Sequence, residues 1–532
     1  MEVEATYDAV LVGSGVGSLA AAIHLAVAGL RPLLLERSAQ VGGTAAYSGG
    51  VIWAPNNHRM RAKGLPDSAE EALDYLDGVS WGRGDPAVAR AYVEELPAIL
   101  EILERETELA LVSYRGLPDY FAEIPGGKPD GRCLLPQPKL VSEALDSAAE
   151  RVPELGLVRP SVHFPAEAGM WAGGRGLVGC LWLRVLEDGT PFELQTRVTE
   201  LLTDEGGTVV GVEAVGPEGP RRFGARYGVL LNTGGFEWNE RMTRASVPAT
   251  AIYPQSPPGL TGDGHRMAAK LGADLALMDQ TIWTPGVRVP GELNEDLQLC
   301  RLCFQDLALS HSAIVNRGGQ RFANETFFQD LARGWCEFDS GSATHPNLPM
   351  YFVFDEEYRR LHGLPASVPV GSYLTRHDTL AELAAANEID PEGLQAQIKR
   401  FNADVEYGWD TQFERGETAY QRAFTEPHAD GGNPTLGTIA APPFYCMEIF
   451  PGTSGHRGGV VCDDSGRVLD VGGEWIDGLY ACGSTAAGLV TGGSYLTGTS
   501  LGHALIFGTL AANRMCKAHQ QEIASYGRAP TR

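Results

Sequence analysis

The sequence predicts an α/β fold, in which a parallel sheet with helices on its faces carries an inserted second domain. Three observations lead to this expectation. A buried apolar run, a glycine-rich turn and a helix-forming segment follow one another from Tyr7 to Leu30. Glycine-ended strands return at 229–236 and 477–484. Residues 276–439 between them carry helical segments and many aromatics but none of these glycine strands, which indicates a separate domain.

The N-terminal unit is expected to form a strand, a turn, a helix and a second strand that ends on Glu36. In such a unit, bare glycine amides and the helix N-terminus bind a pyrophosphate, and the acid holds a ribose hydroxyl. The third position of the glycine pattern is Ser18 rather than glycine, so a tight turn in another α/β fold is the alternative. The expected dinucleotide-binding residues of this unit are Gly13, Gly15, Val16, Gly17, Ser18, Glu36 and Arg37.

Further glycine-rich segments indicate that the dinucleotide is FAD. The loop from Val41 to Gly50 lets the backbone approach a flat ring and a phosphate closely. The two later glycine-ended strands would close the same site from other parts of the chain. The FAD-binding residues expected from these segments and from the C-terminal loop are Gly43, Thr44, Ala45, Ser48, Gly49, Gly50, Gly234, Gly483, Ser500 and Leu501.

Composition limits the partners. The formal net charge of −25 disfavours binding to nucleic acid or anionic lipid. No apolar stretch is long enough to span a membrane and no basic leader opens the chain, so we expect a soluble, cytoplasmic protein. The nine scattered cysteines suit free thiols in a reducing compartment. The single CxxC, Cys300 to Cys303, lacks a second pair of ligands, and no metal site is expected.

Taken together, these segments resemble the flavoproteins of the fumarate reductase and 3-ketosteroid dehydrogenase superfamily. The resemblance implies a Rossmann-like FAD-binding domain built from residues 1–275 and 440–532, with an inserted α+β catalytic, or cap, domain at 276–439. Some relatives attach the flavin through a histidine near Thr44. Because none is present there, FAD should be bound noncovalently.

Two segments separate the branches of this superfamily. Residues 313–330 resemble its NR-x-G-x-RF-x-NE block. Gln329 falls where fumarate-type enzymes carry a proton-delivering arginine and Δ1-ketosteroid dehydrogenases a catalytic tyrosine, and it cannot act as an acid. Between Val468 and Gly502 there is no Lys or Arg. A dicarboxylate would find no charge partner there, so the substrate is expected to be neutral where it meets this loop.

The loop after Gly483 carries the candidate catalytic group. Its Tyr495-x-Thr497-Gly498 resembles the Tyr-x-Ser-Gly of the Δ4-(5α)-ketosteroid dehydrogenases, while Ser494 falls where Δ1 enzymes carry their tyrosine. We therefore expect Tyr495 to transfer the proton, with Thr497 or His503 lowering its pKa. Packing of Tyr495 under the flavin is the alternative.

Residues 118–132 resemble the DY-x-x-E-x-PGG-x-x-x-GR block of the ketosteroid dehydrogenases, which brings Tyr120 to the substrate. The alternative, which the sequence favours equally, is that Tyr120 is only an aromatic side chain beside a Pro-Gly-Gly turn. Tyr120 and the Gly498 amide are expected to polarise the ketone. His456 is expected to pack near the flavin, and Arg321 and Arg457 to be structural or cofactor charges. The residues expected to line the substrate are Ser494, Thr497, Gln329 and Phe328.

The sequence thus predicts an FAD-dependent dehydrogenase, or ene-reductase, acting on a carbon–carbon bond beside a ketone in a neutral hydrophobic molecule. The resemblance makes a 3-ketosteroid or a similar cyclic ketone the leading substrate. Its partners would be this ketone and an electron acceptor or donor that the sequence does not specify. The alternatives are a fumarate-reductase-like reductase of an unsaturated carboxylic acid and a non-catalytic electron-transfer flavoprotein.

Overall fold

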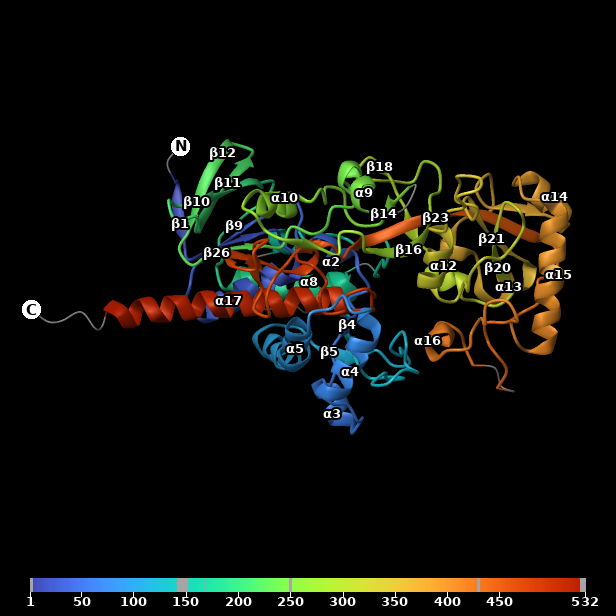
Figure 1. Cartoon of the computed structure of the whole chain (residues 1–532), viewed down its shortest axis with the longest axis horizontal. Helices are drawn as coiled ribbons and strands as arrows, with labels where there is room; N and C mark the ends of the chain where they lie inside the picture. The colour runs from blue at the N-terminus through green and yellow to red at the C-terminus, as the bar shows by residue number, and fades with distance from the viewer. Residues whose placement is uncertain (1–2, 141–151, 168, 248–250, 428–430, 527–532) are drawn as a thin grey trace, which may run out of the picture.

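The computed structural model describes residues 3–140, 152–167, 169–247, 251–427 and 431–526. Figure 1 shows an elongated molecule with two bodies. One body, on the left and in the centre, contains both ends of the described chain. The other, on the right, is made mostly of the middle of the chain and is reached by the long strand β23 (Phe444–His456).

A six-stranded sheet forms the core of the first body, in the order β25-β26-β13-β2-β3-β9. The neighbouring strands from β26 to β9 pair in parallel, and β25 pairs antiparallel to β26 at one edge. The inner strands are short, apolar and buried, as expected of a parallel sheet covered on both faces. The strands are β2 (Ala9–Val12), β3 (Pro32–Leu35), β9 (Phe192–Glu193), β13 (Val229–Leu231), β25 (Arg467–Leu469) and β26 (Trp475–Ala481).

Three helices pack together beside this sheet: α1 (Val16–Val27), α8 (Gly173–Glu187) and the long C-terminal α17 (Thr499–Tyr526). Helix α1 begins directly after Gly15 of the glycine turn. A Cβ atom on Gly508 of α17 would collide with the backbone of Gly17 in α1. These two glycines therefore let the first and last helices of the chain lie against each other, as Figure 1 shows.

A second, four-stranded sheet lies at the outer end of the same body, with the order β1-β12-β11-β10. Strand β1 (Ala5–Tyr7) is separate from β2 because Asp8 turns the chain between them, where its carboxylate accepts the Arg31 amide at 2.7 Å. The other strands are β10 (Arg197–Thr203), β11 (Val209–Gly216) and β12 (Gly219–Ala225).

The second body is built on a seven-stranded sheet organised around β23. This strand of 13 residues pairs with β14, β16, β21 and β22. Strand β23 follows residue 440 in the chain yet belongs to the sheet of the middle segment. The other strands are β14 (Tyr253–Pro254), β16 (Thr281–Val287), β19 (Arg301–Leu302), β20 (Ser312–Asn316), β21 (Met350–Phe354) and β22 (Thr375–His377). The helices here are α11 (Phe304–Leu307), α12 (Phe328–Trp335), α13 (Glu356–His362), α14 (Leu380–Ala386), α15 (Pro391–Tyr407) and α16 (Ala419–Arg422).

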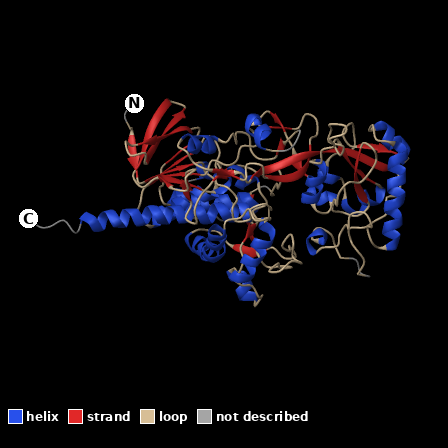
Figure 2. Ribbon diagram, viewed as in Figure 1, coloured by secondary structure: helices blue, strands red, loops and turns tan. Residues whose placement is uncertain are grey.

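A group of helices and a three-stranded sheet, β4-β6-β5, extends below α17 in Figure 1. Figure 2 shows how largely helical this part is. Its elements are α3 (His58–Lys63), α4 (Ala69–Ser80), α5 (Pro86–Glu106), β4 (Ile52–Trp53), β5 (Leu111–Ser113) and β6 (Cys133–Pro136). The remaining short elements are α2 (Gly43–Tyr47), α7 (Val152–Leu155), α9 (Glu240–Ser246), α10 (Asp263–Lys270), β7 (Lys139–Leu140), β8 (Met170–Trp171), β15 (Leu275–Ala276), β17 (Leu293–Asn294), β18 (Leu297–Gln298), β24 (Gly459–Val460), η2 (Pro365–Ser367) and η3 (Gly483–Thr485).

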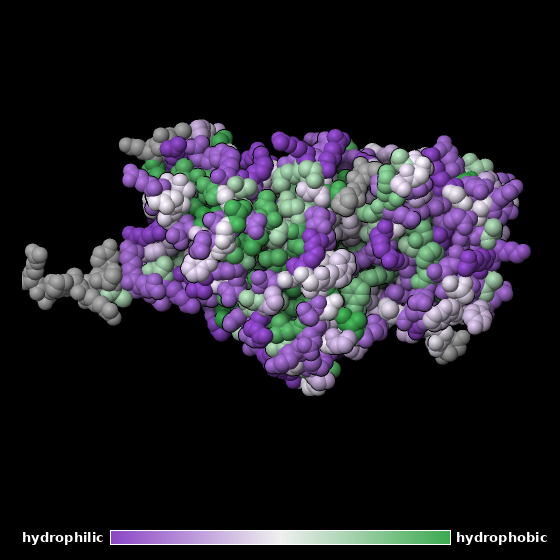
Figure 3. Space-filling model, in the orientation of Figure 1, coloured by the Kyte–Doolittle hydropathy of each residue, from purple (hydrophilic) through white to green (hydrophobic). Residues whose placement is uncertain are grey.

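The face drawn in Figure 3 is largely hydrophilic, and hydrophobic residues gather in its central part. Within the described ranges, no helix combines the length and the apolar character needed to cross a bilayer. The same ranges contain no cluster of three or more His, Cys, Asp or Glu side chains that could hold a metal ion. Cys300 and Cys303 are buried free thiols.

Candidate active site

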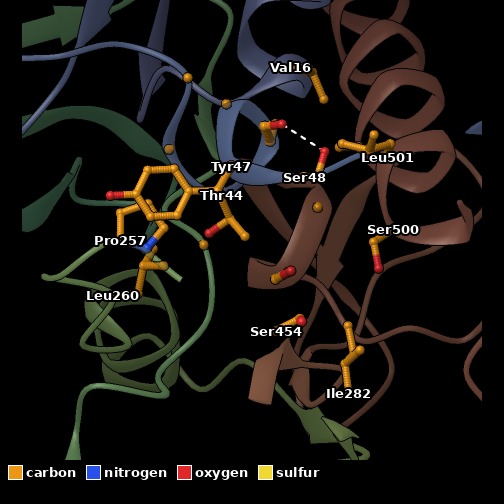
Figure 4. Close-up of a pocket in the computed structure, with 18 of the residues that line it drawn as sticks. Val16, Thr44, Tyr47, Ser48, Pro257, Leu260, Ile282, Ser454, Ser500 and Leu501 are labelled. Carbon is orange, nitrogen blue, oxygen red and sulfur yellow. Dashed lines mark hydrogen bonds between the residues drawn. The ribbon is translucent and has the colours of Figure 1, made fainter. Parts of the chain in front are cut away.

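One long cavity of about 510 Å³ runs between the two bodies. Its wall brings together segments from the two ends of the chain and from the middle. Fifteen of the residues expected to bind FAD line it: Gly13, Gly15, Val16, Glu36, Arg37, Gly43, Thr44, Ala45, Ser48, Gly49, Gly50, Gly234, Gly483, Ser500 and Leu501. Gly17 does not line it, because this glycine faces Cys482 and Ala504 of α17, and Ser18 is buried in α1 away from the wall. Figure 4 shows Thr44, Ser48, Ser500 and Leu501 around this space.

The N-terminus of α1 opens into the cavity. Its N-cap residue, Gly15, makes no side-chain cap, so the first amide groups of the helix are free to bind a ligand. Gly13 has a φ of +93°, and a Cβ atom there would collide with the backbone of Asn232 on the neighbouring strand. This turn suits a pyrophosphate, which the helix dipole also favours.

Glu36 lies at the same end of the cavity, and its carboxylate is fixed by the turn. It accepts hydrogen bonds from the Ser14 amide at 3.0 Å, the Ser14 hydroxyl at 2.6 Å and the Ser38 amide at 2.8 Å. Arg159, in turn, donates to the Ser38 hydroxyl at 2.6 Å. The arrangement gives a nucleoside end with an oriented acid, as the sequence indicates.

The loop at the start of α2 forms the adjoining wall. The Ser48 hydroxyl donates to the Ala45 carbonyl at 2.7 Å and accepts from the Gly50 amide at 3.1 Å. Gly50 has a φ of +78°, and a Cβ atom on it would meet the backbone of Gly174 at 2.6 Å. The loop can therefore lie flat against the start of α8. The free helix amides, the oriented acid and this close backbone wall fit the chemistry of FAD.

The far end of the cavity is aromatic. The ring centroid of Tyr120 lies 4.2 Å from that of Tyr420, 5.8 Å from that of Phe328 and 6.3 Å from that of Tyr495. The other side chains of this end include Leu117, Leu135, Phe304 and Phe424. An apolar aromatic chamber with a few hydroxyl groups favours a hydrophobic ligand that carries one polar group.

The hydroxyl groups of this chamber form two sets. In the first, Tyr120 is hydrogen-bonded to the Thr497 hydroxyl and to Tyr420. Burial raises the pKa of Tyr120 well above 10, and it raises the pKa of Tyr420 as well. Both phenols therefore stay neutral and can donate hydrogen bonds.

Tyr495 forms the second set. Burial raises the pKa of Tyr495 to about 12, while the Ser500 side chain, the charge of Arg457 and the Gly498 amide act in the opposite direction. We expected Thr497 or His503 to do this. The structure corrects both, because Thr497 bonds Tyr120 and burial lowers the pKa of His503 to about 4, which leaves that ring uncharged.

The protein family described as FAD binding domain matches residues 8–501. The chain belongs to this FAD-binding family. It is 34% identical to the 4-oxocyclohexanecarboxylate 2-dehydrogenase of Sinomonas cyclohexanicum, over 95% of this chain and 92% of that protein. It is also 34% identical to a 3-oxosteroid 1-dehydrogenase of Mycobacterium tuberculosis, over 95% and 97% of the two chains.

The fold matches a solved structure from the same group. The 3-ketosteroid Δ1-dehydrogenase of Sterolibacterium denitrificans, determined with 1,4-androstadiene-3,17-dione, aligns with a TM-score of 0.88 at 28% identity. The match covers 96% of this chain and all of that one. These findings confirm the expected FAD cofactor and α/β fold. The chain is an FAD-dependent dehydrogenase of the ketosteroid and cyclic-ketone type.

A buried ion network holds the loop that carries Tyr120. Asp119 accepts hydrogen bonds from Trp53 Nε1 at 2.7 Å and from Arg132 Nη1 at 2.8 Å. Arg132 also pairs with Asp67 at 2.6 Å. Both ends of the DY-to-GR block thus meet in one salt bridge, which explains why the block contains these charges.

The NR-x-G-x-RF-x-NE block also has a supporting role. Arg321 forms paired hydrogen bonds with Glu325, at 2.7 and 2.8 Å, and with Asp410, at 2.9 and 2.8 Å. All three side chains are buried. The block is followed by α12, whose first residue, Phe328, lines the chamber. Arg321 is a structural charge.

Two residues expected to line the substrate lie behind the wall. Gln329 Nε2 donates to the Tyr495 carbonyl oxygen at 2.7 Å. Ser494 is buried next to Tyr495 and is not part of the wall. His456 stacks on Phe236 with ring centroids 3.8 Å apart, and burial lowers its pKa to about 3, so it packs as a neutral ring.

The main residue that the sequence reasoning missed is Tyr420. It lies on α16, a helix of four residues in a segment without any recognisable motif. Gln255, His163 and Ser454 also line the cavity, from loops and from β23. In the structure, Glu123 of the DY-to-GR block connects that block with α16, because its carboxylate accepts a hydrogen bond from the Ala419 amide at 2.8 Å.

Proposed function

We propose that this enzyme removes two hydrogens from the carbon–carbon bond beside the ketone of a neutral, hydrophobic cyclic ketone, with a 3-ketosteroid as the leading candidate. One observation carries the proposal. The aromatic end of the FAD cavity brings together Tyr120, Tyr495, Thr497 and Gly498. No Lys or Arg is among the described residues that line this end.

The cations of the cavity lie at its other end. Arg37 and Arg197 both pair with Asp263, and Arg159 bonds Ser38 next to Glu36. They belong to the nucleoside side and leave the aromatic chamber uncharged. A carboxylate in that chamber would be buried without a partner, at a cost of several kcal/mol. This distribution favours a neutral ketone over an unsaturated carboxylic acid.

We propose that the parts of residues 1–275 and 440–532 that form the first body hold FAD noncovalently, and that residues 276–439, together with strands β14 and β23, supply the cap. The amides of the 13–16 turn would bind the pyrophosphate, Glu36 a ribose hydroxyl, and the loop from Gly43 to Gly50 the flavin side. When bound, FAD supplies a hydride acceptor. Acid denaturation should release the flavin into solution, whereas flavin that stays with the precipitated chain would contradict noncovalent binding.

The roles of the chain's own groups follow from their pKa values. Tyr120, supported by Tyr420, and the Gly498 amide would donate hydrogen bonds to the ketone oxygen, because neutral donors stabilise the enolate that develops there. Tyr495 would take the α-proton. The carbon–hydrogen bond breaks, a phenol O–H bond forms, and the electron pair stays on the substrate as the enolate.

Anaerobic mixing of the holoenzyme with three probes tests the substrate class: a 3-ketosteroid, 4-oxocyclohexanecarboxylate and the methyl ester of that acid. A neutral-ketone dehydrogenase bleaches its flavin with the steroid, and more readily with the ester than with the acid. Bleaching by the acid alone would contradict the neutral chamber. No bleaching by any probe would contradict the enzymatic proposal and favour an electron-transfer role.

A further inference from the structure

Arg457 is a buried cation that has no role in the reaction proposed above. It follows β23 directly and is 6% exposed. Its Nη2 atom donates to the Gly488 carbonyl at 2.9 Å and to the Thr491 hydroxyl at 2.6 Å. Both acceptors belong to the loop that continues to Tyr495. The guanidinium is therefore fixed against the Tyr495 loop.

No carboxylate of the described residues forms an ion pair with Arg457. The acid that acts on its pKa is Asp279, which is held on the surface by Arg83 in two hydrogen bonds of 2.7 and 2.9 Å. Burial lowers the pKa of Arg457 to about 9, so the group remains charged at neutral pH. A buried charge without a counter-ion is costly and calls for a compensating interaction.

A second, small cavity of about 30 Å³ lies beside Arg457 and shares Gly483, Ser484 and Ser500 with the wall of the FAD cavity. Arg457, Thr491, Ser500 and His503 line it. Ser500 is also part of the FAD cavity wall and is one of the groups that stabilise ionised Tyr495. The guanidinium thus lies behind the wall from which Tyr495 faces the chamber.

We propose that Arg457 is a positioning residue whose unpaired buried charge stabilises the phenolate form of Tyr495. This inference rests on the proposed function of Tyr495. Before proton transfer, no described carboxylate pairs with the guanidinium, and the guanidinium gains an anionic partner when Tyr495 loses its proton. An interaction that exists only in the ionised state lowers the barrier to forming that state.

The other titratable groups that face Tyr495 do not compete for this role. Tyr92 of α5, Tyr120, Cys133 of β6 and Tyr420 of α16 all have pKa values raised by burial and stay neutral. His503, which faces Arg457, is neutral because burial lowers its pKa to about 4. Arg457 is thus the permanent charge among the groups that act on Tyr495.

A double-mutant cycle on the holoenzyme tests the inference by anaerobic flavin bleaching with the best ketone. Arg457→Met should lower the rate about tenfold, and Arg457→Lys, which keeps the charge, should recover most of it. In a Tyr495→Phe background, Arg457→Met should change the rate less than twofold, because Arg457 acts through Tyr495. Arg90→Met, which removes an exposed arginine paired with Glu94 on α5, is the control and should leave the rate within twofold.

The reduction potential and content of FAD are measured on the same variants. Both should be unchanged in Arg457→Met. A lower reduction potential, together with a rate loss that does not depend on Tyr495, would mean that the charge acts on the flavin, and it would overturn the inference. Equal losses in both backgrounds, or no rescue by lysine, would show a structural role and overturn it too. Full activity of Tyr495→Phe alone would refute the proposed function of Tyr495 itself, which is a separate result.

Discussion

The side chain of Gln329 donates a hydrogen bond to the carbonyl oxygen of Tyr495 at 2.7 Å. Gln329 stands where related enzymes carry a catalytic arginine or tyrosine, and here it anchors the loop of the proposed base instead. Its amide connects α12 of the cap with the C-terminal loop of the FAD-binding body. The position of the two bodies is thereby linked to the position of Tyr495.

Replacing this anchor should loosen the loop without affecting FAD. Gln329→Leu removes a hydrogen bond worth ~1 kcal/mol, so kcat/KM should fall about fivefold. Gln329→Asn, which keeps the amide but shortens its reach, should show a similar loss. Unchanged kcat/KM in both variants would contradict the anchoring role.

Tyr420→Phe should weaken the polarisation of the ketone. The substitution keeps the aromatic ring, 4.2 Å from that of Tyr120, but removes the hydroxyl bonded to Tyr120 and Thr497. We expect a fall in kcat of about tenfold to a hundredfold, which is at most the lower end of the range for loss of a direct oxyanion donor, because Tyr420 acts through Tyr120. Tyr92→Phe is the control, because Tyr92 is equally buried but donates to the Trp53 carbonyl outside the cavity. Equal kcat in the two variants would refute a role for Tyr420.

The ion network below Tyr120 should matter for stability. Asp119→Ala leaves Arg132 buried with one carboxylate in place of two, so we expect a loss of ~3–5 kcal/mol in the free energy of unfolding. Glu240→Ala, which breaks the exposed pair with Arg244, should cost less than ~1 kcal/mol. Thermal unfolding of the two variants checks the difference, and a similar shift in both would contradict the structural account of the block.

The sequence predicts a feature of this protein well when the residues that form the feature lie close together in the chain. The turn at Gly13, the acid at Glu36 and the loop at Gly43 lie within single segments, so their spacing indicates the FAD site directly. Strand β23 was not expected, because it contains Pro451 and two glycines, residues that normally interrupt strands.

The aromatic chamber was predicted only in part. Tyr120 and Tyr495 occur in recognisable blocks, whereas Tyr420 reaches them through tertiary packing of a helix of four residues. Gly17 was expected to bind the dinucleotide, yet it serves the contact of α1 with α17. Arg457 matters because it is buried and no described carboxylate forms an ion pair with it, and a sequence shows neither burial nor pairing.

The rate of flavin reduction should increase with pH. Burial raises the pKa of Tyr495 to about 12, and the reactive form of the base is the deprotonated one, so activity is lost as the pH falls. Well below the pKa, the phenolate fraction changes about tenfold for each pH unit. Single-turnover bleaching between pH 6 and pH 9 measures this slope. A rate that falls with rising pH would require an acid in place of a base.

The most direct test of the whole account is single-turnover flavin bleaching by the Tyr495→Phe enzyme under anaerobic conditions. The substitution preserves the ring and removes the hydroxyl between Ser500 and the Gly498 amide. With normal FAD content, we predict a rate at least ~100-fold below that of the unmodified enzyme, as expected for loss of a general base. Bleaching at the full rate would contradict proton transfer by Tyr495.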